Sequence, residues 1–413
     1  MFGRVHRVAP TLVLLLTGAA GAGAQAPTVS LREAISRALV NHPDLRAAGA
    51  DVAISRGELV TARTNPFNPS LTWSVEPTVR PGASLTNYQI GIAQVIEVGG
   101  KRAARRGAAK LRLQAAEERR ARQRTIVAWR AQHTFNLALV ARQRALVAIE
   151  ADSVGLALRA AAQDRLTLGQ ATQLEFNVAA AASARDRRVR LKAESDLVST
   201  LIAFRAALGV APDDPLVPFD SVPRFNANPT SPDSSLIAVA LRQRRDLAAL
   251  RAERGAADAD EHLASKLWWP DPELGLSTGR EESLQRTLLG VSVPFPLWNR
   301  GQGQRAVTAA VADRARVAED SAVRAIQREV ADAHQALRSA LASLDAFGGE
   351  IIERLSENLS LARESFEAGK ISLYTYNTIR RDLVEARLAY LEALTDAVDR
   401  RYALALAVGE AWE

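Results

Sequence analysis

Apolar residues recur at helical spacing through two long parts of the chain. In the second part they lie three, four, seven or eight residues apart: Leu337, Leu341, Leu344, Ile352, Leu355, Leu359 and Phe366. Such a pattern, sustained over many turns, is typical of helices that pack as in coiled coils. Proline, which breaks helices, is absent from residues 82–211 and 297–413. Because each residue adds 1.5 Å, a helix of about 65 residues would reach roughly 100 Å. The sequence therefore predicts very long helices.

Two shorter segments, about 69–97 and 272–296, instead alternate apolar and polar residues. The apolar members are Leu71, Trp73, Val75, Tyr88, Ile90 and Ile92 in the first, and Leu274, Leu276, Leu289, Val291, Val293 and Phe295 in the second. Strict alternation predicts β-hairpins with one apolar and one polar face. An amphipathic hairpin that caps a soluble domain would show the same alternation, so this pattern alone leaves both interpretations open.

The two halves of the chain share landmarks at an offset of about 200 residues. Asn68-Pro69-Ser70-Leu71 parallels Asp271-Pro272-Glu273-Leu274, and Gly169 parallels Gly369. This offset indicates an internal repeat, and the prolines clustered in 212–233 indicate a linker. We predict a first repeat in 25–211 and a second in 234–413. Each would carry a helical hairpin whose tip lies near 169 or 369, because glycine accepts the positive φ of a tight turn.

The first 24 residues have the layout of a secretory signal peptide. Arg4, His6 and Arg7 precede a short apolar run, and Ala22-Gly23-Ala24 provides small residues for cleavage. Nowhere else do apolar residues approach an uninterrupted run of 18, so we expect no transmembrane helix in the mature chain. An exported chain can still enter the outer membrane as β-strands. Four strands are too few for a closed barrel, which takes about eight or more, so several copies would have to share one.

Composition argues against enzymatic and nucleic-acid-binding functions. The chain has no cysteine, which excludes disulfides and thiolate metal sites. Its net charge of +7 comes mostly from arginines that alternate with acidic residues, as in Glu117-Glu118-Arg119-Arg120, and this is typical of solvated helices. The five histidines lack metal-ligand spacing, and for His42, beside a proline, we expect a local hydrogen bond. No phosphate loop or G-x-S-x-G motif occurs. We predict no catalytic residue, cofactor or metal site.

Two local motifs then carry a family resemblance. Within the duplicated pattern, the first motif is Asn41-His42-Pro43-Asp44-Leu45, and the second is Ile96-Glu97-Val98-Gly99-Gly100-Lys101-Arg102. In these motifs the chain resembles the TolC family of outer-membrane efflux proteins. The second motif is similar to that of the cation-efflux, CzcC-like branch. The resemblance covers the whole mature chain. It implies a mainly α fold with a membrane β part: a homotrimer with a shared 12-stranded outer-membrane barrel and a periplasmic α-helical tunnel. It also implies two partners, a periplasmic adaptor and an inner-membrane pump of the RND type.

The resemblance further assigns roles to individual residues. Adaptor contacts would fall at the hairpin tips, Leu168, Gly169, Gln170, Ala368, Gly369 and Lys370. The gate would involve Glu175, six residues after the first tip glycine, with Thr375 and Thr378 where the best-known members have aspartates. A ring of three Glu175 side chains would favour cations, whereas the threonines argue against strong selectivity; a structural role is the alternative for Glu175. The expected membrane-interface aromatics are Trp73, Trp268, Trp269 and Trp298.

The favoured function is therefore a passive outer-membrane exit duct for metal cations or small toxic compounds. The only methionine is Met1, so no methionine or cysteine relay could hand on soft ions. One alternative is a periplasmic adaptor, but an adaptor has one helical hairpin and domains rich in short strands. Another is an exported structural coiled coil, which would need neither the two strand pairs nor the repeat.

Overall fold

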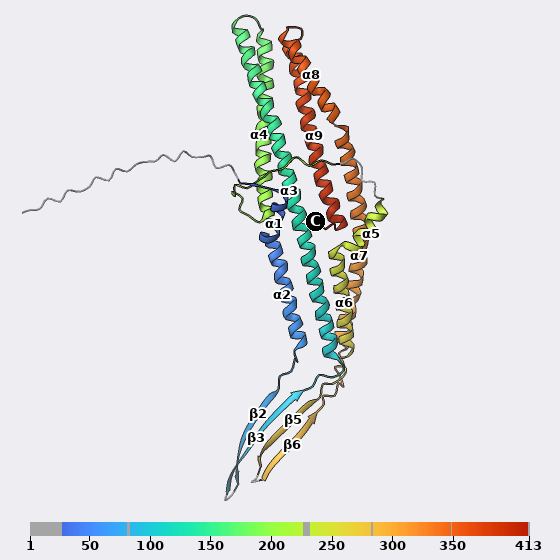
Figure 1. Ribbon diagram of the computed structural model, residues 1–413. Coiled ribbons are helices and arrows are strands. Elements are labelled where there is room, and N and C mark those ends of the chain that lie inside the picture. Colours follow the sequence, from blue (N-terminus) through green and yellow to red (C-terminus); the bar gives the residue numbers. More distant parts are fainter. Residues whose placement is uncertain (1–26, 81–82, 226–231, 282–283, 348, 412–413) are drawn as a thin grey trace, which may run out of the picture.

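The molecule is long and narrow, with all the long strands at one end and two helical hairpin tips at the other (Figure 1). The computed structural model describes residues 27–80, 83–225, 232–281, 284–347 and 349–411. The predicted signal peptide, residues 1–24, lies outside the described residues. Helices connect the two ends, and α3 (Lys101–Thr167) runs along most of that length.

The two halves of the chain repeat one order of elements, helix pair, β-hairpin and long helical hairpin. In the first half the elements are α1 (Leu31–Asn41), α2 (Pro43–Arg63), β2 (Ser70–Arg80), β3 (Ala83–Val95), α3 and α4 (Gln173–Leu208). In the second they are α5 (Asp233–Gln243), α6 (Arg245–Ser265), β5 (Glu273–Glu281), β6 (Leu284–Ser292), α7 (Gln302–Ala346), α8 (Gly349–Glu367) and α9 (Leu373–Val408). The halves differ in one respect. The long helix is continuous for 67 residues as α3 but is divided into α7 and α8, of 45 and 19 residues, in the second half.

The long strands form one antiparallel sheet in the order β2-β3-β5-β6. The central pairing of β3 with β5 joins the two halves, and it places Ile92 opposite both Leu71 and Leu276. A separate parallel pair, β1 (Thr28–Val29) with β4 (Val217–Pro218), ties the N-terminal segment to the inter-repeat segment. Within the described ranges, the outer edges of β2 and β6 have no strand partner.

The core is a thin layer between helices and is built largely of alanine. One cluster gathers around Phe135, Phe204 and Leu208, where α1, α3 and α4 meet. A second gathers around Leu247 and Leu394 and joins α3, α5, α6, α7 and α9. Small side chains let helices approach closely over many turns, so the packing produces an extended wall of helices.

A sharp bend between two short helices opens each half and is fixed by local polar contacts. His42 ends α1 and begins α2, and its Nδ1 accepts a hydrogen bond from the Asp44 N–H at 3.2 Å. This is the local role expected for His42. At the equivalent bend of the second half, the buried Arg244 guanidinium donates to Asp246 at 2.6 Å and to Glu329 at 2.5 Å.

Candidate functional site

The sheet presents one face of large apolar side chains that no other described part of the chain covers. Trp73 is 73% exposed and Leu289 is 74% exposed. The face runs across all four strands and comprises Leu71, Trp73, Val75, Tyr88, Ile90, Ile92, Leu274, Leu276, Leu289 and Val291. Exposing apolar area to water costs about 25 cal/mol per Å², so this face suits an apolar surrounding.

The opposite face is polar and made mostly of small side chains. Gln89 Nε2 donates to Ser277 Oγ across the β3–β5 pair at 2.9 Å. At Gly279 the two strands come so close that an added Cβ would overlap the Tyr88 carbonyl oxygen. The sheet is thus amphipathic, with one face suited to hydrocarbon and the other to water.

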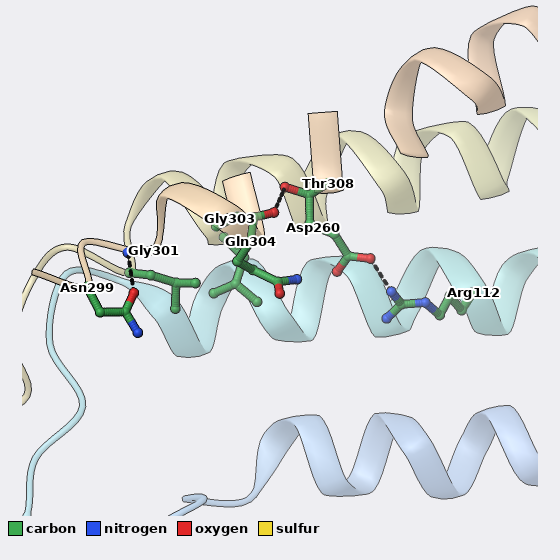
Figure 2. A pocket seen from close by; sticks show the side chains of 10 residues that line it. Arg112, Asp260, Asn299, Gly301, Gly303, Gln304 and Thr308 are labelled. Atoms are coloured by element: carbon green, nitrogen blue, oxygen red, sulfur yellow. Dashed lines mark hydrogen bonds and ion pairs between the residues drawn. The ribbon is translucent and has the colours of Figure 1, made fainter. Parts of the chain in front are cut away.

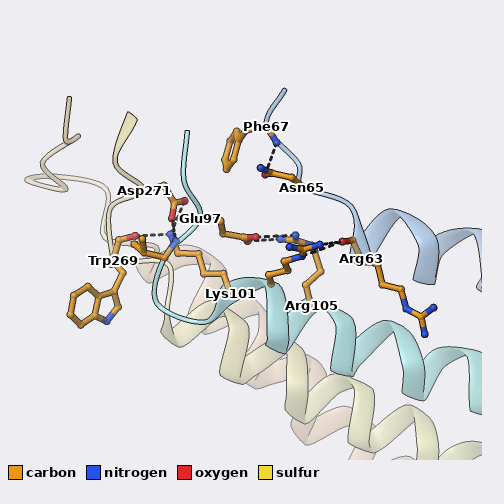
Figure 3. Close-up of polar contacts among 10 residues, drawn as sticks. Arg63, Asn65, Phe67, Glu97, Lys101, Arg105, Trp269 and Asp271 are labelled. Carbon is orange, nitrogen blue, oxygen red and sulfur yellow. Dashed lines mark hydrogen bonds and ion pairs between the residues drawn. The ribbon is translucent and has the colours of Figure 1, made fainter. Parts of the chain in front are cut away.

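The segment 96–102, singled out in the sequence, lies where the sheet meets the helices (Figure 3). Lys101 is only 6% exposed, and its Nζ donates to the Trp269 carbonyl at 2.6 Å and to Asp271 Oδ2 at 2.9 Å. The other carboxylate oxygen of Asp271 accepts from the Val98 N–H at 2.9 Å. These contacts tie the first half to the second at the end of the sheet.

A second set of contacts at this junction holds the start of α3 against its neighbours. Arg105 donates to both oxygens of Glu97, at 2.5 and 3.0 Å, and Arg102 Nε donates to the Arg63 carbonyl at 3.1 Å (Figure 3). Gly99 and Gly100 turn the chain with φ near +70°. The segment is therefore a structural joint that sets the path from strand to helix.

A groove of about 880 Å³ lies beside this joint, between α3, α6 and α7 (Figure 2). Its polar walls include Arg112 of α3, hydrogen-bonded to Asp260 of α6, and Asn299, whose Oδ1 accepts from the Gly301 N–H at 3.1 Å. Burial raises the pKa of the Asp260 carboxyl, and the Arg112 guanidinium opposes this shift. Among the described residues, no group of three or more histidine and acidic side chains could hold a metal ion.

The predicted tip residues lie at the far end of the helices, at two turns of identical geometry (Figure 1). Gly169 and Gly369 have φ of 71° and 72°. In the first tip Gln170 N donates to the Arg165 carbonyl at 2.8 Å, and in the second Lys370 N donates to the Ser365 carbonyl at 2.8 Å. These bonds complete a Schellman motif at the end of each helix. All six tip residues are exposed, Leu168, Gly169, Gln170, Ala368, Gly369 and Lys370.

The gate candidates lie within two turns of these tips. Glu175 is the third residue of α4 and forms a capping box: its N–H donates to Thr172 Oγ1 at 3.2 Å, and its carboxylate accepts from the Thr172 N–H at 3.3 Å. Thr375 N donates to Ser372 Oγ at 3.1 Å, and Thr378 Oγ1 donates to a carbonyl one turn back. Glu175 thus has a structural contact, and its role at a gate stays a prediction.

A buried polar cluster between the two tip hairpins was not predicted from the sequence. Arg380 of α9 is 4% exposed and donates to the Ala151 carbonyl of α3 at 3.0 Å and to Asp186 of α4 at 2.5 Å. Asp152, almost fully buried on α3, lies 3.2 Å from a guanidinium nitrogen of Arg190. Arginines and acids occur along every helix, so the sequence offered no signal that these four side chains pair between the hairpins or that Arg380 and Asp152 are buried.

The four predicted interfacial tryptophans occupy two different positions. Trp73 lies within β2 on the apolar face. Trp268 and Trp269 follow the end of α6, and Trp298 precedes α7, so these three lie at the joint between sheet and helices. All four are exposed, and their placement at a membrane interface stays a prediction.

No helix within the described ranges combines the length and low polarity that crossing a membrane requires. The model of one protein family, described as outer membrane efflux protein, matches the chain twice, over residues 34–210 and 236–410. The chain belongs to this family, as the sequence motifs predicted. It is therefore a channel protein of the outer membrane and not an enzyme, and its long helices form the periplasmic tunnel.

Individual relatives and solved structures agree with this assignment. The chain is 26% identical over 368 residues to the cobalt-zinc-cadmium resistance protein CzcC of Cupriavidus metallidurans, covering 89% of this chain and 86% of that protein. Its fold is similar to that of the CmeC outer membrane channel of Campylobacter jejuni, with a TM-score of 0.78, 17% identity and coverage of 93% and 86%. CusC gives a TM-score of 0.76 at 19% identity, with 92% of each chain covered. The predicted fold class, mainly helical with four antiparallel strands and similar to the TolC-family channels, is confirmed.

Proposed function

We propose that three copies of this chain close their sheets into one 12-stranded barrel and form the exit duct of a tripartite efflux system. The observation that carries this proposal is a four-stranded sheet with an exposed apolar face and, within the described ranges, two unpaired edges. Unpaired edges are not tolerated in hydrocarbon, and four strands are half of the smallest bacterial barrel. Twelve strands would enclose more space than side chains fill, which leaves a water-filled lumen.

Exposed apolar residues along the helices support the same assembly. On α4 they include Leu191, Val198 and Ile202, spaced by seven and four residues, and on α7 they include Val307 and Val311. Spacing of this kind makes stripes along a helix, which suit packing against a helix of the next copy. A wall of helices from three copies would continue the lumen of the barrel toward the periplasmic tips.

The same proposal divides the chain into repeats 25–211 and 234–413, joined by the linker 212–233. The two exposed tips would contact the periplasmic adaptor, and an inner-membrane pump of the RND type would supply the energy. The gate would lie just above the tips and include Glu175, Thr375 and Thr378. The buried contacts of Arg380 favour tips that stay together at rest, because Arg380 links α9 to both helices of the first hairpin.

Metal cations are the proposed cargo. CzcC is named for resistance to cobalt, zinc and cadmium. The nickel-cobalt-cadmium resistance protein NccC of Alcaligenes xylosoxydans xylosoxydans is 27% identical to this chain over 306 residues, which is 70% of this chain and 65% of that protein. A ring of Glu175 carboxylates would favour cations without binding them tightly. Small toxic compounds are the alternative cargo.

Fractionation and mass measurement test the assembly. The protein should sediment with outer membranes, and native mass spectrometry in detergent should report three chains per particle. Recovery as a water-soluble monomer from periplasmic extracts would contradict the proposal.

A complementation experiment tests the cargo. A host that lacks its own exit duct should regain zinc, cobalt or cadmium tolerance only when this chain is expressed with a matching pump and adaptor. Regained tolerance to organic toxicants alone would exclude the metal assignment.

A further inference from the structure

The joint between sheet and helices carries an excess of positive charge. We consider residues 61–69, 95–107, 265–272 and 293–306, which flank the ends of the four long strands. They contain two acidic residues, Glu97 and Asp271, and eight basic residues, Arg63, Lys101, Arg102, Arg105, Arg106, Lys266, Arg300 and Arg305. This layer is therefore strongly basic in every copy of the chain.

Both acids of these segments are already neutralised within them, and Glu273, which begins β5 opposite Val95, lies just outside them. Asp271 pairs with Lys101 at 2.9 Å, and Glu97 pairs with Arg105 at 2.5 Å. The six remaining cations, which we call the basic collar, are Arg63, Arg102, Arg106, Lys266, Arg300 and Arg305. No acidic side chain among the described residues pairs with any of them, and the Arg102 guanidinium donates to a neutral carbonyl. Like charges gathered in one layer attract anions from their surroundings.

The collar directly borders the apolar band of the sheet. Phe295 continues the alternation of Leu289 and Val291 beyond the end of β6 and is 82% exposed, and Trp298 is 87% exposed. Phe67 and Ile96 are exposed at the ends of the neighbouring strands. Aromatic side chains in such positions lie at the boundary between hydrocarbon and headgroups.

One part of this border is held in a fixed turn. The Gln302 side chain donates through Nε2 to the Trp298 carbonyl at 3.0 Å and accepts from the Arg300 N–H at 2.7 Å. The backbone turn that carries an exposed tryptophan and an exposed arginine two residues apart is thereby held in place. The ring suits acyl chains, and the cation suits a phosphate at the level where the acyl chains end.

We propose that the basic collar binds the phosphodiester headgroups of anionic phospholipids in the periplasmic leaflet of the outer membrane. The helices extend from the sheet into the periplasm, so the collar lies at that leaflet. A soluble anion would account for the charge but not for the exposed aromatic border beside it. This inference rests on the outer-membrane location of the sheet and is independent of cargo, adaptor and pump.

A charge-removal pair of variants tests the collar. The test variant is R106Q/K266Q/R300Q, whose three side chains make no hydrogen bond or ion pair among the described residues. The control is R142Q/R159Q/R188Q, which removes three exposed arginines from the helices toward the tips. Both proteins, purified in neutral detergent, are titrated with phosphatidylglycerol, phosphatidylcholine or lipid A, and bound lipid is counted by native mass spectrometry at low and high salt.

The wild type and the control should bind phosphatidylglycerol in preference to phosphatidylcholine, and salt should weaken this preference. The preference should fall about 100-fold in the test variant, since each of its three lost cations is worth roughly fivefold near an anionic surface. Conductance in planar bilayers checks that both variants still form channels, so a failed duct is distinguished from a failed lipid site. No preference in the wild type, an equal loss in the control, or a loss confined to lipid A would overturn the proposal.

Discussion

The Arg380 contact makes a sharp prediction about the helical tips. Replacing Arg380 by methionine keeps an unbranched side chain of similar length but removes both donors, those to the Ala151 carbonyl and to Asp186. Asp186 is itself mostly buried, because its carboxylate lies against the backbone of Gly155, where an added Cβ would approach it to 2.6 Å. The R380M variant therefore leaves a carboxylate with no cation and little access to water.

Removing one partner of a buried ion pair costs about 3–5 kcal/mol. Both hydrogen bonds of the Arg380 guanidinium join α9 to the first tip hairpin, so part of this cost should appear as easier separation of the two hairpins. Each 1.4 kcal/mol changes an equilibrium about tenfold, so a cost of about 3 kcal/mol would raise the population of separated tips by more than about 100-fold. Adding D186N should recover about half of the stability, because an amide tolerates the site without a counter-ion.

Planar-bilayer recordings of the purified protein measure the resting conductance, and thermal unfolding measures stability. R380M should show a higher open probability and a lower Tm than the wild type. The matched control is R381Q, since Arg381 is 45% exposed and pairs on the surface with Asp382, a contact worth at most about 1 kcal/mol. Equal behaviour of R380M and R381Q, or an unchanged resting conductance in R380M, would refute the argument.

Three further substitutions test other parts of the structure. G279A should prevent assembly into detergent-stable oligomers, because its Cβ would overlap the Tyr88 carbonyl across the sheet; G290A, with open space at its Cβ, should assemble normally on native gels. E175Q should lower cation preference in bilayer recordings while keeping the helix cap, since glutamine also completes a capping box; unchanged selectivity would remove Glu175 from the gate. K101M should lower the free energy of unfolding by about 3 kcal/mol or more, because it leaves Asp271 unpaired at the joint; an unchanged denaturant midpoint would contradict this.

The sequence predicted the elements of this fold closely where a single periodicity decided them. The hairpin expected at about 69–97 contains β2 and β3, which together run from Ser70 to Val95. The helix of about 65 residues is α3, with 67. The alternation of apolar and polar residues and the positions of the prolines are local signals in the sequence. They were sufficient to predict these strands and helices because local residue preferences determine where such elements form.

Three features could not be derived in this way. The second long helix ends at Ala346 and resumes at Gly349, although no proline occurs there, and the proline criterion therefore missed the break. The pairing of β3 with β5 and the burial of Arg380 depend on which distant segments meet. The residues next to these positions in the sequence give no information about such contacts. The β3–β5 pairing and the burial of Arg380 could therefore be found only from the structure.

The β3–β5 pairing also has a consequence for how the exported chain matures. Gln89 and Ser277, which meet across it, are separated by 188 residues, so the first hairpin reaches the periplasm long before its partner strand. Closing so long a loop is slow, and an open apolar strand invites wrong partners in the meantime. During this delay the newly translocated polypeptide should be a client of periplasmic holdases, and their depletion should lower its yield more than that of proteins whose strands pair only with near neighbours.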